Sequence, residues 1–133
     1  MIVGGNEFFV RASDSGSPRK LHSLWDGRLG TGTTANARLT RSALNNAIRI
    51  QALFPRTTLS ELQSHHSVES WSKESRESAI HDVYRDGTLE PGQDANHATI
   101  LPVGYTKHAK EVAERRIVLA GYRLTDEIRS VIR

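Results

Sequence analysis

The stretch YTKHAKEVAERRIVLAGYRLTDEIRSV, residues 105–131, decides the fold class. Its apolar and small residues recur every three or four positions, at Ala109, Val112, Ala113, Ile117, Ala120, Gly121, Leu124, Ile128 and Val131. This period predicts one long amphipathic helix. Gly121 lowers helix propensity by about 1 kcal/mol relative to Ala, and its presence inside the helix predicts a close crossing with another helix.

Two more helices are predicted upstream of this stretch. The first begins at Thr34 or Ala35 and ends at Phe54, because Pro55 disfavours a helical residue before it. The second follows Ser67, and its narrow apolar stripe repeats every four residues at Trp71, Ser75, Ala79 and Val83. Three main helices make the protein mainly α, with the helices arranged as a bundle.

Shorter elements complete the predicted fold. Residues 7–10 form a strand, and residues 19–21 provide a weak return strand, so a small β-hairpin lies near the N-terminus. Thr57 or Thr58 caps a short helix, because Glu61 stands three residues after Thr58, as in a capping box. No internal repeat or long linker divides the sequence, so residues 1–133 are predicted to form a single domain.

Composition excludes several classes of protein. The 133 residues include 18 Lys and Arg against 15 Asp and Glu, which gives only a mild attraction for phosphate-bearing partners. There is no cysteine, so disulfides and thiolate metal sites are excluded. No apolar run approaches the roughly 20 residues of a membrane span. Residues 1–5 lack the features of a signal peptide, and the cellular compartment stays open.

His22 and Asp26 are the candidate metal ligands. They are four residues apart in the segment 21–26, which reads as a helical turn closed by Gly27, so both side chains share one helix face and could hold one metal ion. A catalytic zinc site ordinarily takes three protein ligands, and an isolated His-x-x-x-Asp pair is more often a surface salt bridge. Trp25, between them, is expected to anchor the core.

The other polar and aromatic residues favour structural roles. Trp71 and Tyr84 are expected to pack in the core instead of stacking on bases. Alternating Arg and Glu residues between 111 and 129 indicate an exposed, charged helix face. The remaining histidines lie in polar segments and are not expected to bind metal: His65, His66, His81, His97 and His108.

Four motifs occur in order along the chain: Gly4-Gly5-Asn6, Leu21-His22-Ser23-Leu24-Trp25-Asp26, Trp71-Ser72-Lys73-Glu74-Ser75 and Ala120-Gly121-Tyr122-Arg123-Leu124. Together they resemble the C-terminal half of the zinc-dependent single-strand nucleases of the S1/P1 type, a family that includes mung bean nuclease. The Leu-His-x-x-Trp-Asp element is fairly specific for this family, whereas the first or the last motif alone would be weak evidence for the resemblance. The resemblance covers essentially all of this chain.

The resemblance implies a helical phospholipase C/P1 nuclease-like fold and a function on nucleic acid. Members of the family cut phosphodiester bonds in single-stranded DNA or RNA, often remove 3′-phosphates from nucleotides, use three zinc ions and are usually secreted or periplasmic. His22 and Asp26 match the last ligand pair of that site, and the family's upstream ligands have no counterpart here. The chain would therefore hold at most one partial zinc site and would be inactive alone.

Two alternatives stay open at this stage. The chain could be a non-enzymatic helical interaction module that binds an acidic partner or nucleic acid. Its binding would then weaken as the salt concentration rises and would not depend on zinc. Helices that lack part of their packing partners would also expose apolar surface, which predicts self-association or a covering partner chain.

Overall fold

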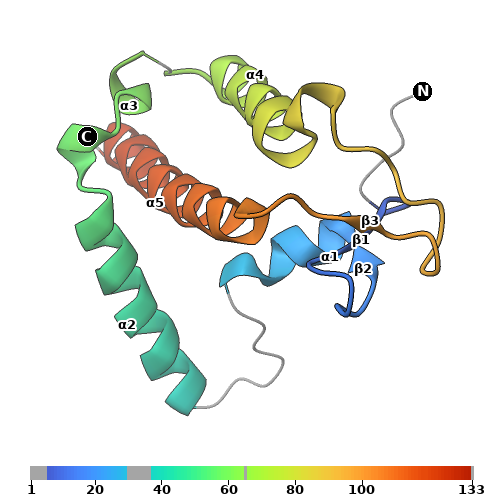
Figure 1. Ribbon diagram of the computed structural model, residues 1–133. Helices are drawn as coiled ribbons and strands as arrows, with labels where there is room; N and C mark the ends of the chain where they lie inside the picture. The colour runs from blue at the N-terminus through green and yellow to red at the C-terminus, as the bar shows by residue number, and fades with distance from the viewer. Residues whose placement is uncertain (1–5, 30–36, 65, 133) are drawn as a thin grey trace. The chain divides into compact units, whose positions relative to one another are not determined.

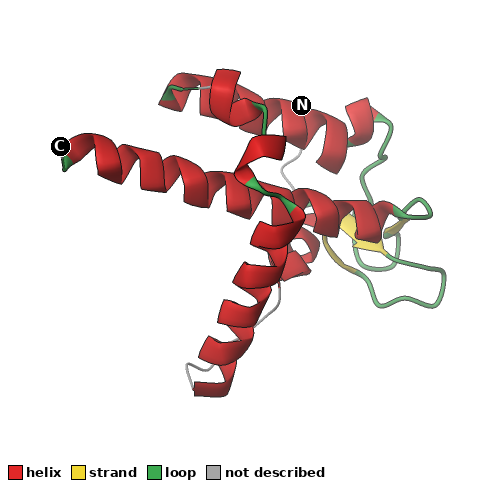
Figure 2. Cartoon of the chain, turned by 90° about the vertical axis from the view of Figure 1, so that its left-hand side faces the viewer, coloured by secondary structure: helices red, strands yellow, loops and turns green. Residues whose placement is uncertain are grey.

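The computed structural model describes residues 6–29, 37–64 and 66–132, and Figures 1 and 2 show that helices dominate them. The helices are α1 (Leu21–Asp26), α2 (Ala37–Leu53), α3 (Glu61–Ser64), α4 (Val68–Ser78) and α5 (Tyr105–Val131). The strands are β1 (Phe9–Arg11), β2 (Arg19–Lys20) and β3 (Thr99–Ile100). Shorter helical segments are also present. They are 3-10 turns at Gly27–Leu29, Arg56–Thr58 and Arg85–Gly87 and a π turn at Ala79–Val83. The predicted mainly α class with an N-terminal hairpin is confirmed.

The chain divides into two compact units. The first comprises Met1–Gly30 and Ser75–Ala113, and the second comprises Thr31–Glu74 and Glu114–Arg133. Both α4 and α5 therefore contribute residues to each unit.

The small sheet lies in the first unit, with strand order β2-β1-β3. β1 pairs antiparallel with β2, where Phe9 faces Lys20, so the predicted hairpin is confirmed. β1 also pairs in parallel with β3, where Val10 faces Thr99. This third strand was not predicted, because Pro102 and a glycine interrupt the apolar run that begins at residue 100.

The core of the first unit forms around the sheet, α1 and the start of α5. Its buried residues are Phe8, Val10, Leu21, Leu24, Leu89, Leu101, Tyr105 and Ala109. Trp25 and Tyr84 are partly buried and pack against this cluster, as predicted for both side chains. The Tyr84 ring lies 6.1 Å from the Phe8 ring, centroid to centroid.

The second unit has a separate, smaller core. Its buried residues are Ile50, Leu59, Val118 and Leu119, with Phe54, Leu62 and Tyr122 packed against them. The bounds predicted for α5 are confirmed, but its buried face differs from the expected apolar stripe. Val118 and Leu119 are buried, whereas Ile117, Leu124 and Ile128 are exposed.

Four local predictions are wrong. Gly121 makes no close crossing, because a Cβ atom there would meet nothing within 4 Å. Thr58 lies inside a 3-10 turn, and its hydroxyl donates to the Pro55 carbonyl, so it does not cap α3. The glycines at positions 27, 30 and 32 predict a loop over residues 27–34, but residues 27–29 form a 3-10 turn. The charged face of α5 is not fully exposed, since Glu114 and Arg123 are both buried.

The N-terminal turn at Gly4-Gly5 and the start expected for α2 at Thr34 or Ala35 lie outside the described residues. Among the helices that are described, none has the length and apolar character needed to cross a membrane.

Candidate metal centre

The candidate metal ligands project from α1. Leu21 and Leu24 turn one side of this short helix into the core, where they are 0% and 2% exposed. His22 and Asp26 lie one helical turn apart on another side, and their side chains are 54% and 64% exposed. The Nε2 atom of His22 is 2.9 Å from the Oδ2 atom of Asp26. The structure thus brings the predicted pair together on an accessible surface.

Trp25 fixes the position of α1. Its indole N–H donates to the hydroxyl of Tyr105 at 3.0 Å, and that hydroxyl donates to the carbonyl of Val83 at 2.7 Å. The Trp25 and Tyr105 rings meet edge to face, with centroids 6.2 Å apart. Burial raises the pKa of Tyr105, so the hydroxyl keeps the proton that it donates. The predicted core anchor therefore connects α1 to α5 and to the π turn.

The pair fits two positions of a zinc coordination sphere. Zinc binds imidazole nitrogen and carboxylate oxygen at about 2.0–2.2 Å, so two ligand atoms of a tetrahedral ion stand roughly 3.3 Å apart. The observed 2.9 Å separation needs only a small adjustment to reach that value. Within the described residues, no group of three or more His, Asp or Glu side chains could hold a metal ion. The described residues thus offer one pair of candidate ligands and no complete site.

Comparison with protein families decides the family of the chain. Residues 2–133 match the sequence profile described as S1/P1 Nuclease. The chain belongs to the S1/P1 nuclease family. No curated protein and no solved structure matched the chain. Membership confirms the resemblance carried by the four motifs and indicates a nuclease-like, hydrolytic function on nucleic acid in a family that is generally zinc-dependent.

The other described histidines of this S1/P1 nuclease chain are exposed, and three of them contact aspartates. His81 pairs with Asp86, His97 Nδ1 lies 2.9 Å from Asp94, and His108 Nε2 lies 2.8 Å from Asp82. The hydrogen bond to the His97 side chain, together with those from backbone N–H groups, lowers the pKa of Asp94. His66 contacts the Gln63 carbonyl, and His65 lies outside the described residues.

A second polar cluster joins α3, α4 and α5 in the second unit. Glu74 accepts hydrogen bonds from Arg116 and from Arg123, and Glu61 accepts two from the Nη2 atom of Arg115 at 2.7 Å. Sequence reasoning missed these pairs, because their partners are 42 to 54 residues apart. One feature of the sequence could have indicated the Glu74–Arg123 pair, since these two residues lie inside two of the four family motifs.

Proposed function

We propose that this chain is the C-terminal portion of a single zinc-dependent nuclease domain. The complete domain would hydrolyse phosphodiester bonds of single-stranded DNA or RNA and remove 3′-phosphates from nucleotides. His22 and Asp26 would bind one zinc ion, and residues outside positions 1–133 would supply the other ligands of a three-zinc site.

The contact between His22 and Asp26 is the observation that carries the proposal. A ring nitrogen and a carboxylate oxygen are ligand types that zinc prefers, and they lie 2.9 Å apart on a helix held by buried leucines. Family membership supports the nucleic-acid substrate, since the match spans residues 2–133.

Each residue has a distinct task in this proposal. His22 and Asp26 hold the ion, and Leu21 and Leu24 keep their helix oriented by packing into the core. Zinc bound in such a site lowers the pKa of bound water and stabilises charge that develops on phosphate oxygens. The exposure of both ligand side chains leaves them open to the remaining ligands and to the substrate.

A nuclease assay tests the proposal. The purified chain with zinc should show no hydrolysis of single-stranded DNA above that of a His22→Ala variant, because two ligands do not complete a catalytic site. Strong hydrolysis that depends on His22 would contradict the proposed need for further ligands.

Reconstitution provides the positive arm of the test. Mixing the chain with a polypeptide that carries the upstream ligands of an S1/P1 nuclease should produce zinc-dependent hydrolysis, and His22→Ala should abolish it. His97→Ala is the matched control, because His97 is an exposed histidine that also contacts an aspartate through its ring. Equal activity in all three mixtures would refute the role of His22.

A further inference from the structure

A basic side chain stands on each side of the His22–Asp26 pair in the sequence. Lys20 directly precedes α1, and Arg28 lies two residues after Asp26, in the 3-10 turn that follows the helix. Neither Lys20 nor Arg28 forms an ion pair with a described carboxylate, whereas the arginines of the second polar cluster do. Two cations that lack a carboxylate partner among the described residues therefore flank the candidate metal centre.

The guanidinium of Arg28 is held at the C-terminal end of α1. Its Nε atom donates to the Leu24 carbonyl at 2.8 Å. Leu24 stands two residues from both His22 and Asp26, so the guanidinium lies within about one helical turn of both ligands along the helix axis. The two terminal nitrogens of Arg28 carry four further N–H donors, which make no hydrogen bond to another described residue. These donors are available to an acceptor on a bound ligand.

Lys20 lines a hollow of about 530 Å³ beside the start of α1. Its ammonium lies 5.9 Å from the centroid of the Phe9 ring, which lines the same hollow. On the other side is the loop at 91–93, which is tied to β1 because the Phe9 N–H donates to the Gly92 carbonyl at 3.0 Å. The hollow and the ligand pair belong to the same compact unit. A ligand that fills the hollow would thus lie close to the first turn of α1.

One acidic residue, Glu7, also lines this hollow. It is exposed and does not form an ion pair with Lys20, so the lysine charge is not neutralised within the hollow. An anion bound at Lys20 would be attracted by the ammonium and repelled by the Glu7 carboxylate. The two charges therefore make opposite predictions for substitutions, which allows a test of what the hollow binds.

We propose that Lys20 and Arg28 bind phosphates of a single-stranded nucleic acid, one on each side of the phosphate at the His22–Asp26 pair. The assignment rests on the proposed function, which places the substrate strand along α1. Ammonium and guanidinium groups are common phosphate contacts, and they position a strand without reading its bases. The six residues of α1 rise about 9 Å, which is about three nucleotides at a stacked spacing of about 3.4 Å. Cations at both ends of α1 thus match the phosphates that flank a central one.

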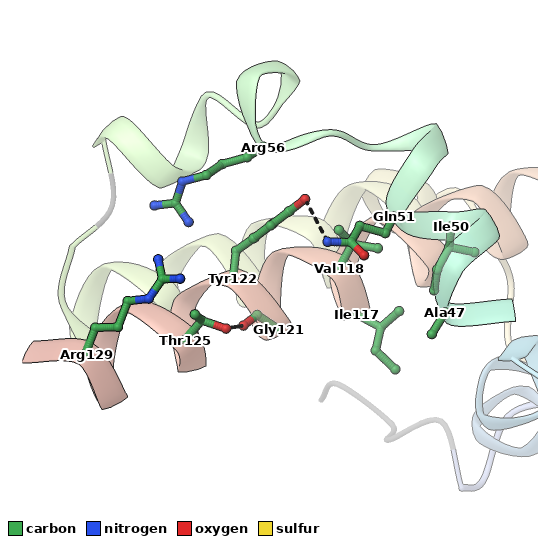
Figure 3. Close-up of a pocket in the computed structure, with 10 residues that line it drawn as sticks. All are labelled: Ala47, Ile50, Gln51, Arg56, Ile117, Val118, Gly121, Tyr122, Thr125 and Arg129. Carbon is green, nitrogen blue, oxygen red and sulfur yellow. Dashed lines mark hydrogen bonds between the residues drawn. The ribbon is translucent and has the colours of Figure 1, made fainter. Parts of the chain in front are cut away.

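Fluorescence anisotropy of a labelled DNA single strand of about twelve nucleotides, with the 133-residue chain in chelator, tests the proposal. Lys20→Ala and Arg28→Ala should each weaken binding several-fold and reduce the slope of log affinity against log salt by about 0.7. Arg129→Ala is the matched control, because Arg129 lies in a groove of the other unit (Figure 3) and forms no ion pair with a described carboxylate. Equal losses in Arg28→Ala and Arg129→Ala would overturn the proposal, because they would show that only net charge matters.

Three further variants separate phosphate binding from a purely structural role. Arg28 also caps a carbonyl at the end of α1, so its loss could act through the helix. Arg28→Lys keeps the charge and should retain most of the binding, whereas Arg28→Gln should bind as weakly as Arg28→Ala. Glu7→Gln removes the repelling carboxylate and should strengthen binding several-fold, a gain that structural damage would not produce. Equal binding by the Lys and Gln variants, or no gain from Glu7→Gln, would contradict the phosphate contacts.

Addition of zinc distinguishes a failure of this proposal from a failure of the proposed function. Zinc held by His22 and Asp26 would add positive charge between Lys20 and Arg28, so it should tighten binding of the strand, and His22→Ala should remove that gain. Dependence on Lys20 and Arg28 without any gain from zinc would support the phosphate contacts and contradict the zinc ligands. A gain from zinc without any effect of Lys20→Ala or Arg28→Ala would support the zinc ligands and overturn the phosphate contacts.

Discussion

The guanidinium carbon of Arg123 lies 5.2 Å from the centroid of the Trp71 ring. The same guanidinium donates to Glu74 at 2.6 Å, so one side chain joins two motifs that stand far apart in the sequence. The Arg123 and Glu74 side chains are only 9% and 11% exposed. The contact therefore ties α4 to α5 through a buried, hydrogen-bonded ion pair.

Removal of Arg123 should destabilise the chain strongly. Arg123→Ala leaves the buried Glu74 carboxylate with Arg116 but without its second guanidinium, and breaking such a pair costs about 3 kcal/mol. Lys73→Ala removes an exposed pair with Glu69 and should cost less than about 1 kcal/mol. Urea unfolding of both variants measures the difference, and equal losses would contradict the structural role of Arg123.

Stability should fall at acid pH partly because of Glu61. Burial raises the pKa of Glu61, but hydrogen bonds from its own backbone N–H and from Arg115 outweigh burial and lower the pKa below its ordinary value of 4.5. The ionised carboxylate thus stabilises the folded chain above pH 4.5, and this contribution is lost as pH falls through the folded-state pKa.

Glu61→Gln tests this pH dependence. The variant should be about 1 kcal/mol less stable than the parent chain at pH 7, and the difference should shrink as the pH falls below 4.5. Glu69→Gln is the control, because Glu69 is 80% exposed and should change stability little at either pH. A Glu61→Gln effect that is constant with pH would rule out this contribution.

Replacement of two glycines by alanine should change the stability of the chain in opposite directions. A Cβ atom on Gly92 would collide with backbone atoms of Phe9, His97 and Thr99, so Gly92→Ala should displace a strand and cost several kcal/mol. Gly121→Ala meets open space within α5 and should stabilise the chain by up to about 1 kcal/mol. Thermal melts of the pair distinguish these effects, and destabilisation by Gly121→Ala would show a contact that the structure does not contain.

The link between Trp25 and Tyr105 should contribute to stability through the Tyr105 hydroxyl. Tyr105→Phe removes the acceptor of the Trp25 indole N–H and the donor to Val83, which costs about 1–3 kcal/mol when the groups stay buried. Tyr122→Phe is the control, because the hydroxyl of Tyr122 accepts a long, exposed hydrogen bond from Gln51 at 3.4 Å. Similar unfolding free energies for both variants would contradict the proposed anchor.

Sequence periodicity predicted the helices well and their buried faces less well. The bounds of α5 follow from its repeat, because every turn of this helix carries an apolar or small residue. Its buried side could not be predicted, since Ile117 and Val118 are adjacent and equally apolar. The parallel pairing of β3 with β1 was also inaccessible, because two paired residues carry no periodic signal.

For the candidate site too, local sequence predicted some features and not others. The spacing of His22 and Asp26 placed both proposed ligands on one face of α1, because four residues make about one helical turn. The Trp25–Tyr105 hydrogen bond spans 80 residues, and the Glu74–Arg123 pair spans 49. Local pattern does not encode such contacts, so sequence reasoning assigned Arg123 to an exposed face.

The most direct test of the central claim is a calorimetric titration of zinc into the chain and its variants. The proposed site predicts one ion per chain, with binding weakened at least ten-fold by His22→Ala and by Asp26→Ala and unchanged by His97→Ala. Zinc binding that is the same in all four proteins, or absent from the parent chain, would contradict the assignment of His22 and Asp26 as zinc ligands.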